Sequence, residues 1–569
     1  AIQARSALWM SIHRFLSGQT LTNRYSHTLM LIFLMCSRKS YKKQLFFSVL
    51  DSGYRTPRGV LTGNLLDLGN YYQCLGINRP TPNSVIEGKY CMINLPVGDI
   101  PLPALTFQIA VCIPKSCTTR TAINSMFGGS ELVDFTYNII FKYKLDFVFF
   151  KDLQKPKVTN KLFLAFSAFT NTRRLVTYTP VPGALECLDG IRSLAMMWVI
   201  IGHSFSTPVA INITGNPMEV YNVSITYSAW IIAAPITVDT FFMLSGLLVV
   251  YTTAGKLTSM KLLKNLHLFY LNRLLRMFPV LAAVILLQVS LLNWIADGPL
   301  WVMPAAQTHN CRVYWWSTLL YIQNYCLGHS WYLAIDVQLH IISPLVLVWV
   351  LTGRRRLAWM ALVGALIAVL AASTTYNYIM KFSPGLVVPS RIPDATDYLN
   401  YYYFNTLTRA SPFFVGLIFG YLLHLKRRKK VTIPLIVVGI LWVCALVISS
   451  LIVYSVYPIT QIDWDNLFAD GMINSFMRPG WALSVGWIIF ACVHGYGGMP
   501  DFRFSLYILR FHMFKDAYKH YEGSCDIFVR LSYAMYLIHY PMMFVTSAMP
   551  VTLVHFSLSF AVCILYIVI

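Results

Sequence analysis

Charged residues are scarce in this chain. Only 12% of its 569 residues are Asp, Glu, Lys or Arg, whereas 56% are hydrophobic and the mean hydropathy is +0.57. Soluble domains carry about 25% charged residues, so the composition excludes a soluble globular protein and indicates one that crosses a membrane several times. Acidic residues are the scarcest, and the formal net charge is +22. The basic residues stand in short runs beside apolar segments, as membrane orientation requires, so no nucleic-acid partner is expected.

Two kinds of chemical motif are also missing. No GxSxG sequence occurs, which disfavours a serine acyl-enzyme. Paired CxxC spacing is absent, and residues 51–117 contain no histidine, so no metal site is predicted. That region instead holds four cysteines among many Gly, Pro and Asn residues: Cys74, Cys91, Cys112 and Cys117. Two disulfides in a small lumenal domain are expected, with three possible connectivities, and four unpaired structural cysteines are the alternative.

Long apolar stretches of near 20 residues predict the membrane spans. They lie at 191–210, 229–251, 278–296, 331–351, 357–373, 409–425, 432–457, 476–497, 527–547 and 549–569. The predicted fold class is therefore an all-α polytopic membrane protein with about ten transmembrane helices. A small disulfide-bonded domain precedes them on the lumenal or extracellular side.

The loops between these segments predict the orientation. Basic residues follow the second, fourth and sixth spans, which assigns those loops to the cytoplasm: Lys256, Lys261, Lys264, Arg354 to Arg356 and Lys426 to Lys430. The opposite loops carry two glycosylation acceptors, Asn212 and Asn222. They also carry Cys311 and Cys326, possible disulfide partners in an oxidising compartment.

The predicted domain order conflicts with the predicted membrane topology. Residues 1–50 are an uncertain N-terminal segment, 51–117 the cysteine-rich domain, 118–183 an atypical linker and 184–569 the membrane domain. The first span must begin in the cytoplasm, yet the linker offers no helix to bring the chain there from the lumen. Either a helix is missing from the linker, which we favour, or the cysteine-rich domain is reduced and cytoplasmic. Residues 498–526 are highly charged and aromatic with no clear pattern, unlike the membrane domain around them. The apolar last residues suggest an incomplete C-terminus.

The first span carries two ionisable residues, Arg192 and His203. Eleven residues at about 100° each place them within about 20° of one another on one helix face, about 16 Å apart along the axis. Arg192 would lie at the cytoplasmic mouth and His203 near the middle of the membrane. Ionisable groups inside a membrane tend to mark functional cavities, although a structural, hydrogen-bonded histidine is the alternative.

The second span supplies a carboxylate, Asp239, at a depth close to that of His203. Such a carboxylate would fix the tautomer of the imidazole and raise its basicity, as a general base needs. A helix cap or a packing contact is the alternative for Asp239. Both residues are predicted to be catalytic.

Further polar residues lie on the third and fourth spans. Arg273 and Arg276 share one helix face and suit the phosphates of a nucleotide-bearing donor, or equally serve as cytoplasmic anchors. Asp336 and His340, four residues apart, share a face beside Trp331 and give a secondary polar site.

The ordered set of these pieces resembles the acyltransferase-three family of multi-pass membrane acyltransferases, and within it the animal branch called nose resistant to fluoxetine. The matching sequences are CLDGIRSLAMMWVIIGHS, VDTFFMLSGLLVVY, FYLNRLLRMFPVLAAVIL, CLGHSWYLAIDVQLHIISPL and RLSYAMYLIHYP. GVLTGNLLDLGNYYQCLGI and AVCIPKSC resemble the N-terminal domain of that branch. The resemblance covers about residues 51–117 and 184–550.

The resemblance implies that His203 acts in acyl transfer and that Arg192 helps to hold the donor, an acyl-CoA used as co-substrate with no bound cofactor. It also places Asp239, Arg273 and Arg276 at family positions, and Asp336 where many members carry Glu. The predicted function is a membrane O-acyltransferase with a hydroxyl acceptor, in the plasma membrane or the endoplasmic reticulum. The alternatives are a carrier of lipids or lipophilic molecules, and a lumenal binding module anchored by the bundle.

Overall fold

In the computed structural model of the chain, the N-terminal region is described in part and the helical region almost throughout. The described residues are 64, 66–81, 84–96, 106–115, 171–172, 185–210, 213–216, 229–322, 328–385, 388, 391, 394, 397–427, 429, 431–461, 463–497 and 512–549, with side chains from 530 in the last range. Residues 1–50 and the predicted span 549–569 lie almost entirely outside this set.

The N-terminal domain is a four-stranded sheet with one short helix, which the prediction of an all-α protein did not include. The elements are β1 (Leu66–Asp67), α4 (Tyr71–Leu75), β2 (Asn78–Thr81), β3 (Ser84–Pro96) and β4 (Thr106–Pro114). The strand order is β1-β4-β3-β2, with β3 antiparallel to both neighbours and β1 parallel to β4. Residues 109–113 of the central strand β4 are all buried, because both faces of that strand are covered.

A disulfide joins the short helix to the sheet. Cys74 of α4 is bonded to Cys112 of β4, with 5.7 Å between the Cα atoms. The helix lies so close to β3 that a Cβ at Gly88 would be 1.9 Å from the carbonyl oxygen of Cys74, so only glycine fits there. One of the expected disulfides is thus present. The complementary pair would be Cys91 with Cys117, and Cys117 lies outside the described residues.

Tyr90 ties the central strands to β1 and gives a prediction for the stability of this domain. Its hydroxyl donates a 2.7 Å hydrogen bond to the carbonyl of Leu68, and burial together with the nearby Asp67 carboxylate raises its pKa above the ordinary value of 10.0. Tyr90→Phe is expected to cost about 1 kcal/mol. The unfolded chain ionises this phenol above pH 10.0 while the folded chain keeps the proton, so the wild-type domain loses stability as the pH rises beyond that value.

The measurement is the urea midpoint of the sheet in the detergent-solubilised full-length protein, read by the infrared amide band at neutral pH and at about pH 11. Tyr90→Phe should lower the neutral midpoint and weaken its dependence on alkaline pH. An unchanged alkaline loss in the variant would contradict the assignment to Tyr90.

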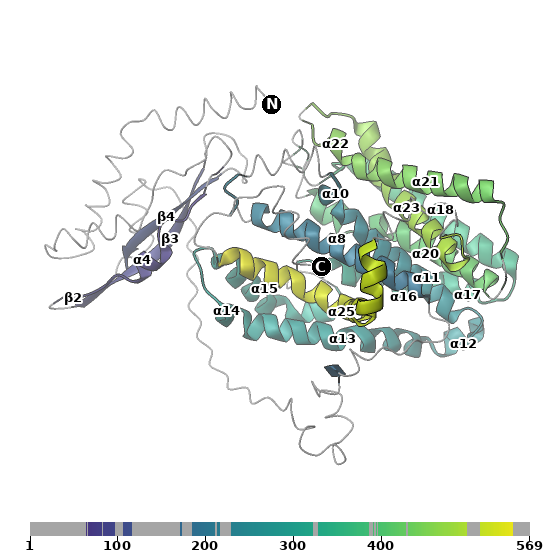
Figure 1. The fold of residues 1–569 in the computed structure, drawn as a ribbon, viewed down its shortest axis with the longest axis horizontal. Helices are drawn as coiled ribbons and strands as arrows, with labels where there is room; N and C mark the ends of the chain where they lie inside the picture. Colours follow the sequence, from purple (N-terminus) through teal and green to yellow (C-terminus); the bar gives the residue numbers. More distant parts are fainter. Residues whose placement is uncertain are drawn as a thin grey trace, which may run out of the picture.

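The remainder of the described chain is helical (Figure 1). Its elements are α8 (Glu186–Ala210), α10 (Ala229–Ile232), the 3₁₀ helix η3 (Ala234–Ile236), α11 (Thr237–Thr253), α12 (Ser259–Lys264), α13 (Leu266–Ser290), α14 (Leu292–Ile295), α15 (Val302–Leu319), α16 (Trp331–Ile342), α17 (Pro344–Val350), α18 (Arg355–Met380), the π-helix η5 (Tyr398–Tyr403), α20 (Thr406–Lys426), α21 (Leu435–Tyr454), α22 (Val456–Ile459), α23 (Leu467–Val493) and α25 (His512–Ala548).

By length and apolar composition, six helices of the described residues can cross a membrane, or seven if the bent pair α16–α17 is one span. The six are Ala234–Thr253, Leu266–Ser290, Arg355–Met380, Tyr398–Lys426, Leu435–Ile459 and Leu467–Val493. The protein is thus an integral multi-pass membrane protein, with six or seven candidate spans among the described residues, where ten were predicted over the whole sequence. The predicted spans at 191–210 and 527–547 are helical, within α8 and α25, but they are not among these candidates.

Several helices are longer than the apolar stretches that predicted them. The third span was expected to begin at 278, but α13 begins at Leu266 and includes Arg273 and Arg276. Likewise the span predicted to begin at 476 belongs to α23, which begins at Leu467 and includes Asp470. Charged residues interrupt a hydropathy pattern, whereas a helix continues through them where the fold buries or pairs them. The loop predicted between the third and fourth spans also contains a helix, α15, packed beside α13.

Helices α11 and α20 pack with their backbones in contact at the centre of the bundle. A Cβ at Gly246 would lie 2.1 Å from the carbonyl oxygen of Phe413, and one at Gly416 would lie 2.1 Å from that of Met243. Glycines allow this close approach, which is a common way for helices to associate in membranes. The contact sets the first turns of the two helices side by side.

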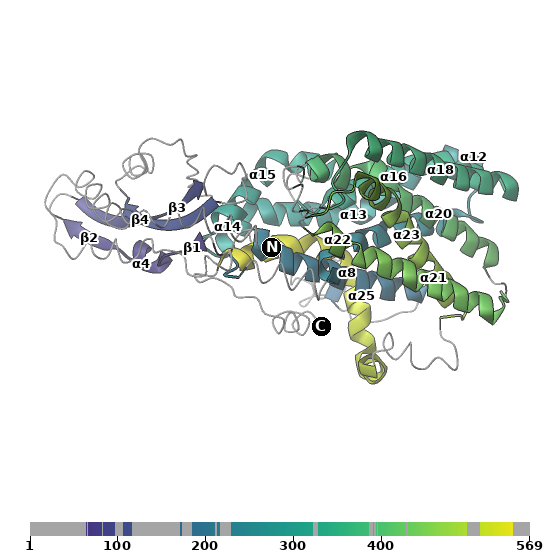
Figure 2. The same cartoon turned by 90° about the horizontal axis from the view of Figure 1, so that it is seen from above.

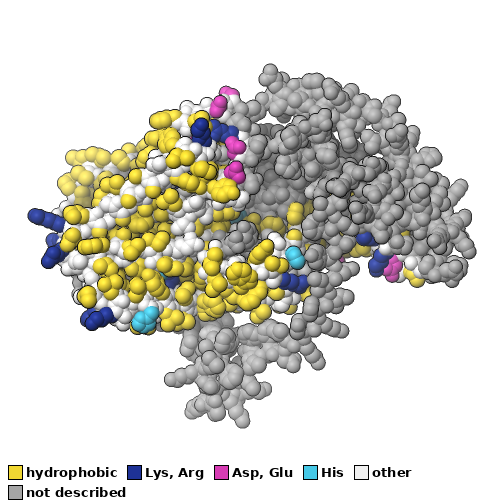
Figure 3. All heavy atoms as spheres, turned by 180° about the vertical axis from the view of Figure 1, so that it is seen from behind, with side chains coloured by type: hydrophobic (Ala, Val, Ile, Leu, Met, Phe, Trp, Pro, Cys, Tyr) yellow, Lys and Arg dark blue, Asp and Glu magenta, His cyan; other side chains and the backbone are white. Residues whose placement is uncertain are grey.

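The sheet domain sits at one end of the helical bundle (Figures 1 and 2). Leu66 and Leu68 form an apolar cluster with Ile213, Leu300 and Ala548, which follow α8, precede α15 and end α25. Of the predicted cytoplasmic basic residues, Lys261 and Lys264 lie on α12, Arg355 and Arg356 begin α18, and Lys426 ends α20. Helix α12 lies at the end of the bundle away from the sheet (Figure 1). Figure 3 shows a broad apolar surface on one face of the bundle, with Lys and Arg side chains at its left edge and a few elsewhere.

The structure shows the same conflict between the position of the sheet domain and the start of α8. The start of α8 packs near the basic end, where Leu188 contacts a cluster that includes Leu423 and Phe490. The sheet domain contacts the opposite end, so the chain must travel the length of the bundle between Lys115 and Leu185. Most of that stretch lies outside the described residues.

Candidate functional site

A cluster of three histidines forms where α8, the start of α16 and α25 meet. The ring of His203 lies 5.4 Å from that of His539, and the ring of His329 lies 5.2 Å from that of His539, measured between centroids. Tyr540 closes the group, with its ring 4.9 Å from that of His203 and 5.2 Å from that of His329. Three segments far apart in the sequence therefore place imidazoles around one point.

The three histidines differ in their hydrogen bonds. Nδ1 of His539 lies 2.7 Å from the carbonyl oxygen of Tyr536 and 3.1 Å from that of Met535, so this nitrogen must carry the proton. Its Nε2 is buried and without a hydrogen bond among the described residues. Both ring nitrogens of His329 are likewise buried and without a hydrogen bond among the described residues. The main-chain carbonyl of His329 accepts a hydrogen bond from the Tyr536 hydroxyl.

His203 has the most open position of the three. Its side chain is only partly buried, whereas His329 is 4% exposed and His539 9%. In the described part of the chain, no hydrogen bond uses a ring nitrogen of His203. A ring nitrogen of His203 is therefore available to a substrate hydroxyl, as a general base requires.

The predicted basic residues gather nearer the basic end of the same helices. Arg192 of α8 is close enough to Arg276 of α13 and Tyr332 of α16 to interact with them electrostatically. Nη1 of Arg192 bonds to Asp189 at 3.2 Å, in a pair that is 26% and 45% exposed. Such a half-exposed pair is weak, so Arg192 can exchange its partner for an incoming anion.

Arg273 is held differently from Arg192. Its Nη2 donates to the carboxylate of Asp336 and to Oγ of Ser245 at 2.7 Å. Asp336 is 3% exposed, so this ion pair is largely removed from water. The charge of Arg273 is therefore already compensated, while Arg276 is exposed and has no such partner in the described residues.

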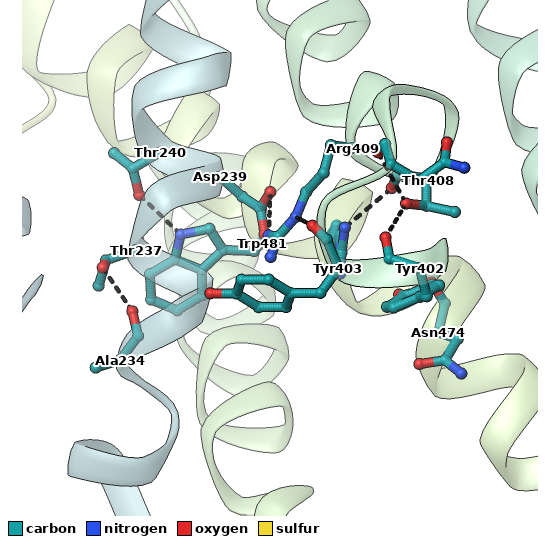
Figure 4. Close-up of polar contacts among 12 residues, drawn as sticks. Ala234, Thr237, Asp239, Thr240, Tyr402, Tyr403, Thr408, Arg409, Asn474 and Trp481 are labelled. Atoms are coloured by element: carbon teal, nitrogen blue, oxygen red, sulfur yellow. Dashed lines mark hydrogen bonds and ion pairs between the residues drawn. The ribbon is translucent and has the colours of Figure 1, made fainter. Parts of the chain in front are cut away.

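Asp239 does not pair with His203 as we predicted. Nη1 of Arg409 donates to both carboxylate oxygens of Asp239 at 3.0 Å, and both side chains are almost fully buried (Figure 4). Within the described residues no hydrogen bond joins Asp239 to His203. Matching depths on two helices do not determine which faces meet, and here the packing of α11 against α20 turns Asp239 toward Arg409.

Aromatic rings and backbone carbonyls enclose the Asp239–Arg409 pair. The guanidinium of Arg409 lies 4.2 Å from the ring of Tyr403 and 4.9 Å from that of Trp331, and Nε donates to the carbonyl of Tyr403 at 3.1 Å. Figure 4 shows that this carbonyl comes from the turn of η5 just before α20. Tyr403 is the last residue of η5, so its carbonyl is one of those that a helix end leaves without an intrahelical partner, and it accepts from the buried guanidinium.

The predicted secondary polar site divides into three places. Trp331 packs on Arg409, and Asp336 binds Arg273. His340 instead stacks on Phe269, with 4.3 Å between ring centroids and 13° between planes. Asp336 and His340 both contact α13, as residues on one helix face can. Their neighbours on that helix differ, since Asp336 binds Arg273 and His340 stacks on Phe269.

The remaining predictions have mixed outcomes. Cys311 is disulfide-bonded, and Cys326, its expected partner, lies outside the described residues. Asn212 and Asn222 also lie outside them. In the part of the chain that the structure describes, no group of three or more His, Cys, Asp and Glu side chains has a geometry that could hold a metal ion.

Comparisons with known proteins bear on the two parts of the chain separately. Residues 185–569 match the model of the Acyltransferase domain family, and residues 35–126 match that of the Nose resistant-to-fluoxetine protein, N-terminal domain. The first match covers well over half of the chain. The chain belongs to the acyltransferase-three family.

A curated relative supports the same assignment. The chain is 24% identical over 586 residues to "Nose resistant to fluoxetine protein 6" of Caenorhabditis elegans, which covers 82% of this chain and 70% of the relative. No solved structure matches it. The resemblance inferred from the sequence pieces is thus confirmed, and membership of the acyltransferase-three family suggests acyltransferase activity.

Within this acyltransferase-three chain, sequence reasoning overlooked His329 and Arg409. His329 stands two residues before Trp331, inside a family-like piece, and the run GHSWY was its available signal. Arg409 was taken only as the first residue of a span. An arginine beside an apolar stretch with no nearby acid was the signal there, because a buried guanidinium needs a partner from elsewhere.

Proposed function

We propose that this chain is an integral membrane O-acyltransferase that moves an acyl group from a cytoplasmic acyl-CoA-type donor to a hydroxyl acceptor. The observation that carries the proposal is the arrangement on α8, where a partly buried, unbonded His203 stands about 16 Å along the helix from the exchangeable Arg192. That spacing suits a donor whose phosphates stay at the basic end while its thioester reaches the histidines.

The basic group suits the donor. Arg192 and Arg276 are near enough to interact electrostatically, and neither is held by a buried acid among the described residues. Guanidiniums bind phosphates through paired, charge-assisted hydrogen bonds, so these two side chains are the proposed donor contacts. Arg273 lies in the same region but is neutralised by Asp336, and its proposed part is to hold α13 against α16.

The proposed chemistry is direct transfer. A ring nitrogen of His203 takes the proton from the acceptor hydroxyl as the oxygen attacks the thioester carbonyl. The carbon–sulfur bond then breaks, and the histidine returns its proton to the leaving thiolate. The aromatic rings beside that of His203 are the imidazole of His539 and the phenol of Tyr540.

The test of this proposal is transfer by the purified full-length protein in lipid vesicles. An acyl-CoA labelled in the acyl group is offered with a panel of hydroxyl acceptors, including sterols, glycerolipids and sugars. Label should move to one acceptor class and CoA should be released in equal amount. Movement of unmodified lipid or acyl donor between the two leaflets, without CoA release, would instead show a carrier and overturn the enzyme proposal.

Arg192 gives a prediction about donor binding. Arg192→Gln is expected to raise KM for acyl-CoA by about 10–100-fold, because a hydrogen bond to a charged group contributes about 1.5–3 kcal/mol. The value of kcat should change little, since the phosphate contact exists in both ground and transition states. The matched control is Arg354→Gln, an exposed arginine at the same end of the bundle. Equal KM values in both variants would remove Arg192 from the donor site.

A further inference from the structure

His539 is the one member of the histidine cluster whose proton position the structure determines. Nδ1 faces two carbonyl oxygens, which only accept hydrogen bonds, so a neutral ring keeps its proton on Nδ1 and its lone pair on Nε2. Nε2 is buried and has no partner in the described residues. A buried acceptor without a donor is costly, and it therefore marks a place where a donor is expected.

The neighbouring ring that can supply this donor is His203. Its centroid is 5.4 Å from that of His539, at an interplanar angle of 46°. At that separation ring nitrogens meet directly after a small rotation or through one water, and catalytic hydrogen bonds commonly tighten only when substrate is bound. His329 is also a neighbour of His539, with 5.2 Å between ring centroids, but it is 4% exposed, whereas His203 is partly exposed and is the ring that a substrate can reach.

We propose that His539 positions His203 by accepting a hydrogen bond from one of its ring nitrogens, which fixes the proton there and leaves the other nitrogen as the base. This inference rests on the proposed acyltransferase function and gives His539 the part that the sequence had assigned to Asp239. The chain of bonds runs from the carbonyls of Met535 and Tyr536 through His539 to His203. The acceptor proton goes to the free nitrogen of His203, and His539 keeps its own proton throughout.

Two substitutions of His539 distinguish the roles of its two ring nitrogens. His539→Asn retains a donor near the position of Nδ1 and removes the acceptor, whereas His539→Gln places an amide oxygen near the position of Nε2. We expect His539→Asn to lower kcat by about 10²-fold, at the lower end of the effect of a general base, with KM for donor and acceptor unchanged. His539→Gln should recover a large part of kcat. Loss of similar size in both variants, or no loss in His539→Asn, would overturn the proposal.

The chain offers a matched control for the main-chain hydrogen bond. Nδ1 of His494 lies 3.0 Å from the carbonyl oxygen of Phe490, four residues earlier, just as Nδ1 of His539 faces that of Met535. His494→Asn should leave kcat unchanged, because its ring is outside the cluster. If it lowers kcat as much as His539→Asn does, the effect is structural and the proposal fails.

A second readout does not depend on activity. In protein labelled with ¹⁵N-histidine, the imidazole signals that disappear in His203→Ala belong to His203. They should report one tautomer in the wild type and a mixture in His539→Asn. A mixture already present in the wild type would overturn the positioning role even in an active enzyme. Absence of acyl transfer with a single, His539-dependent tautomer would instead count against the proposed function alone.

Discussion

Replacing His203 with alanine is expected to lower kcat for acyl transfer by about 10²–10⁴-fold, the usual contribution of a general base. The substitution removes the imidazole that lies partly exposed beside Tyr540 and His539, without disturbing a hydrogen bond of its ring. The KM for the acyl donor should remain near the wild-type value, because the proposed phosphate contacts lie at the other end of α8. The measurement is the steady-state rate of label transfer in vesicles at saturating donor.

The control for this prediction is the unfolding midpoint of the same preparation in detergent, with His494→Ala as a second variant. Both should unfold close to the wild type, and only His203→Ala should lose transfer. Activity retained in a folded His203→Ala protein would remove the histidine from the chemistry. The proposed direct mechanism would then need another base from the cluster.

Breaking the Asp239–Arg409 pair is expected to cost about 3–5 kcal/mol of stability, because either single substitution leaves a charge buried without its partner. Asp239 is 0% exposed and Arg409 is 1% exposed, so water cannot compensate the remaining charge. Asp239→Asn and Arg409→Met should each lower the unfolding midpoint in detergent strongly. The guanidinium also carries the aromatic contacts with Trp331 and Tyr403, so Arg409→Met should additionally loosen the start of α20.

The double variant, Asp239→Asn with Arg409→Met, distinguishes structure from catalysis. Removing both charges together should recover much of the lost stability, since a buried ion pair is often no more stable than an uncharged replacement. If Asp239 acts only through Arg409, acyl transfer should recover in parallel with stability. A stable double variant with the low kcat of His203→Ala would restore the catalytic role first predicted for Asp239.

The sheet domain shows where sequence patterns stop being informative. Four cysteines predicted a small disulfide-bonded domain, and the Cys74–Cys112 bond is present. The pairing itself could not be chosen from spacing, because it depends on α4 lying across β3 at Gly88. Strand order and the parallel pairing of β1 with β4 are likewise contacts between distant segments.

The membrane class and the face shared by Arg192 and His203 could be determined from the sequence alone. Both depend on local properties: composition measures apolar surface directly, and the covalent geometry of one helix sets the angle between two of its residues. The recognition of the acyltransferase-three family also rested on short ordered pieces that do not require a fold.

Only the tertiary structure decided the partners of the charged and aromatic side chains. Asp239 and Arg409 are 170 residues apart, and Tyr536 reaches the carbonyl of His329 across 207 residues. Which faces of two helices meet depends on glycines such as Gly246 and Gly416, which allow α11 and α20 to touch. In a medium without water each buried charge must find its partner within the protein, so helix packing, rather than depth along any one helix, paired Asp239 with Arg409. The same packing placed the ring of His203 beside that of His539.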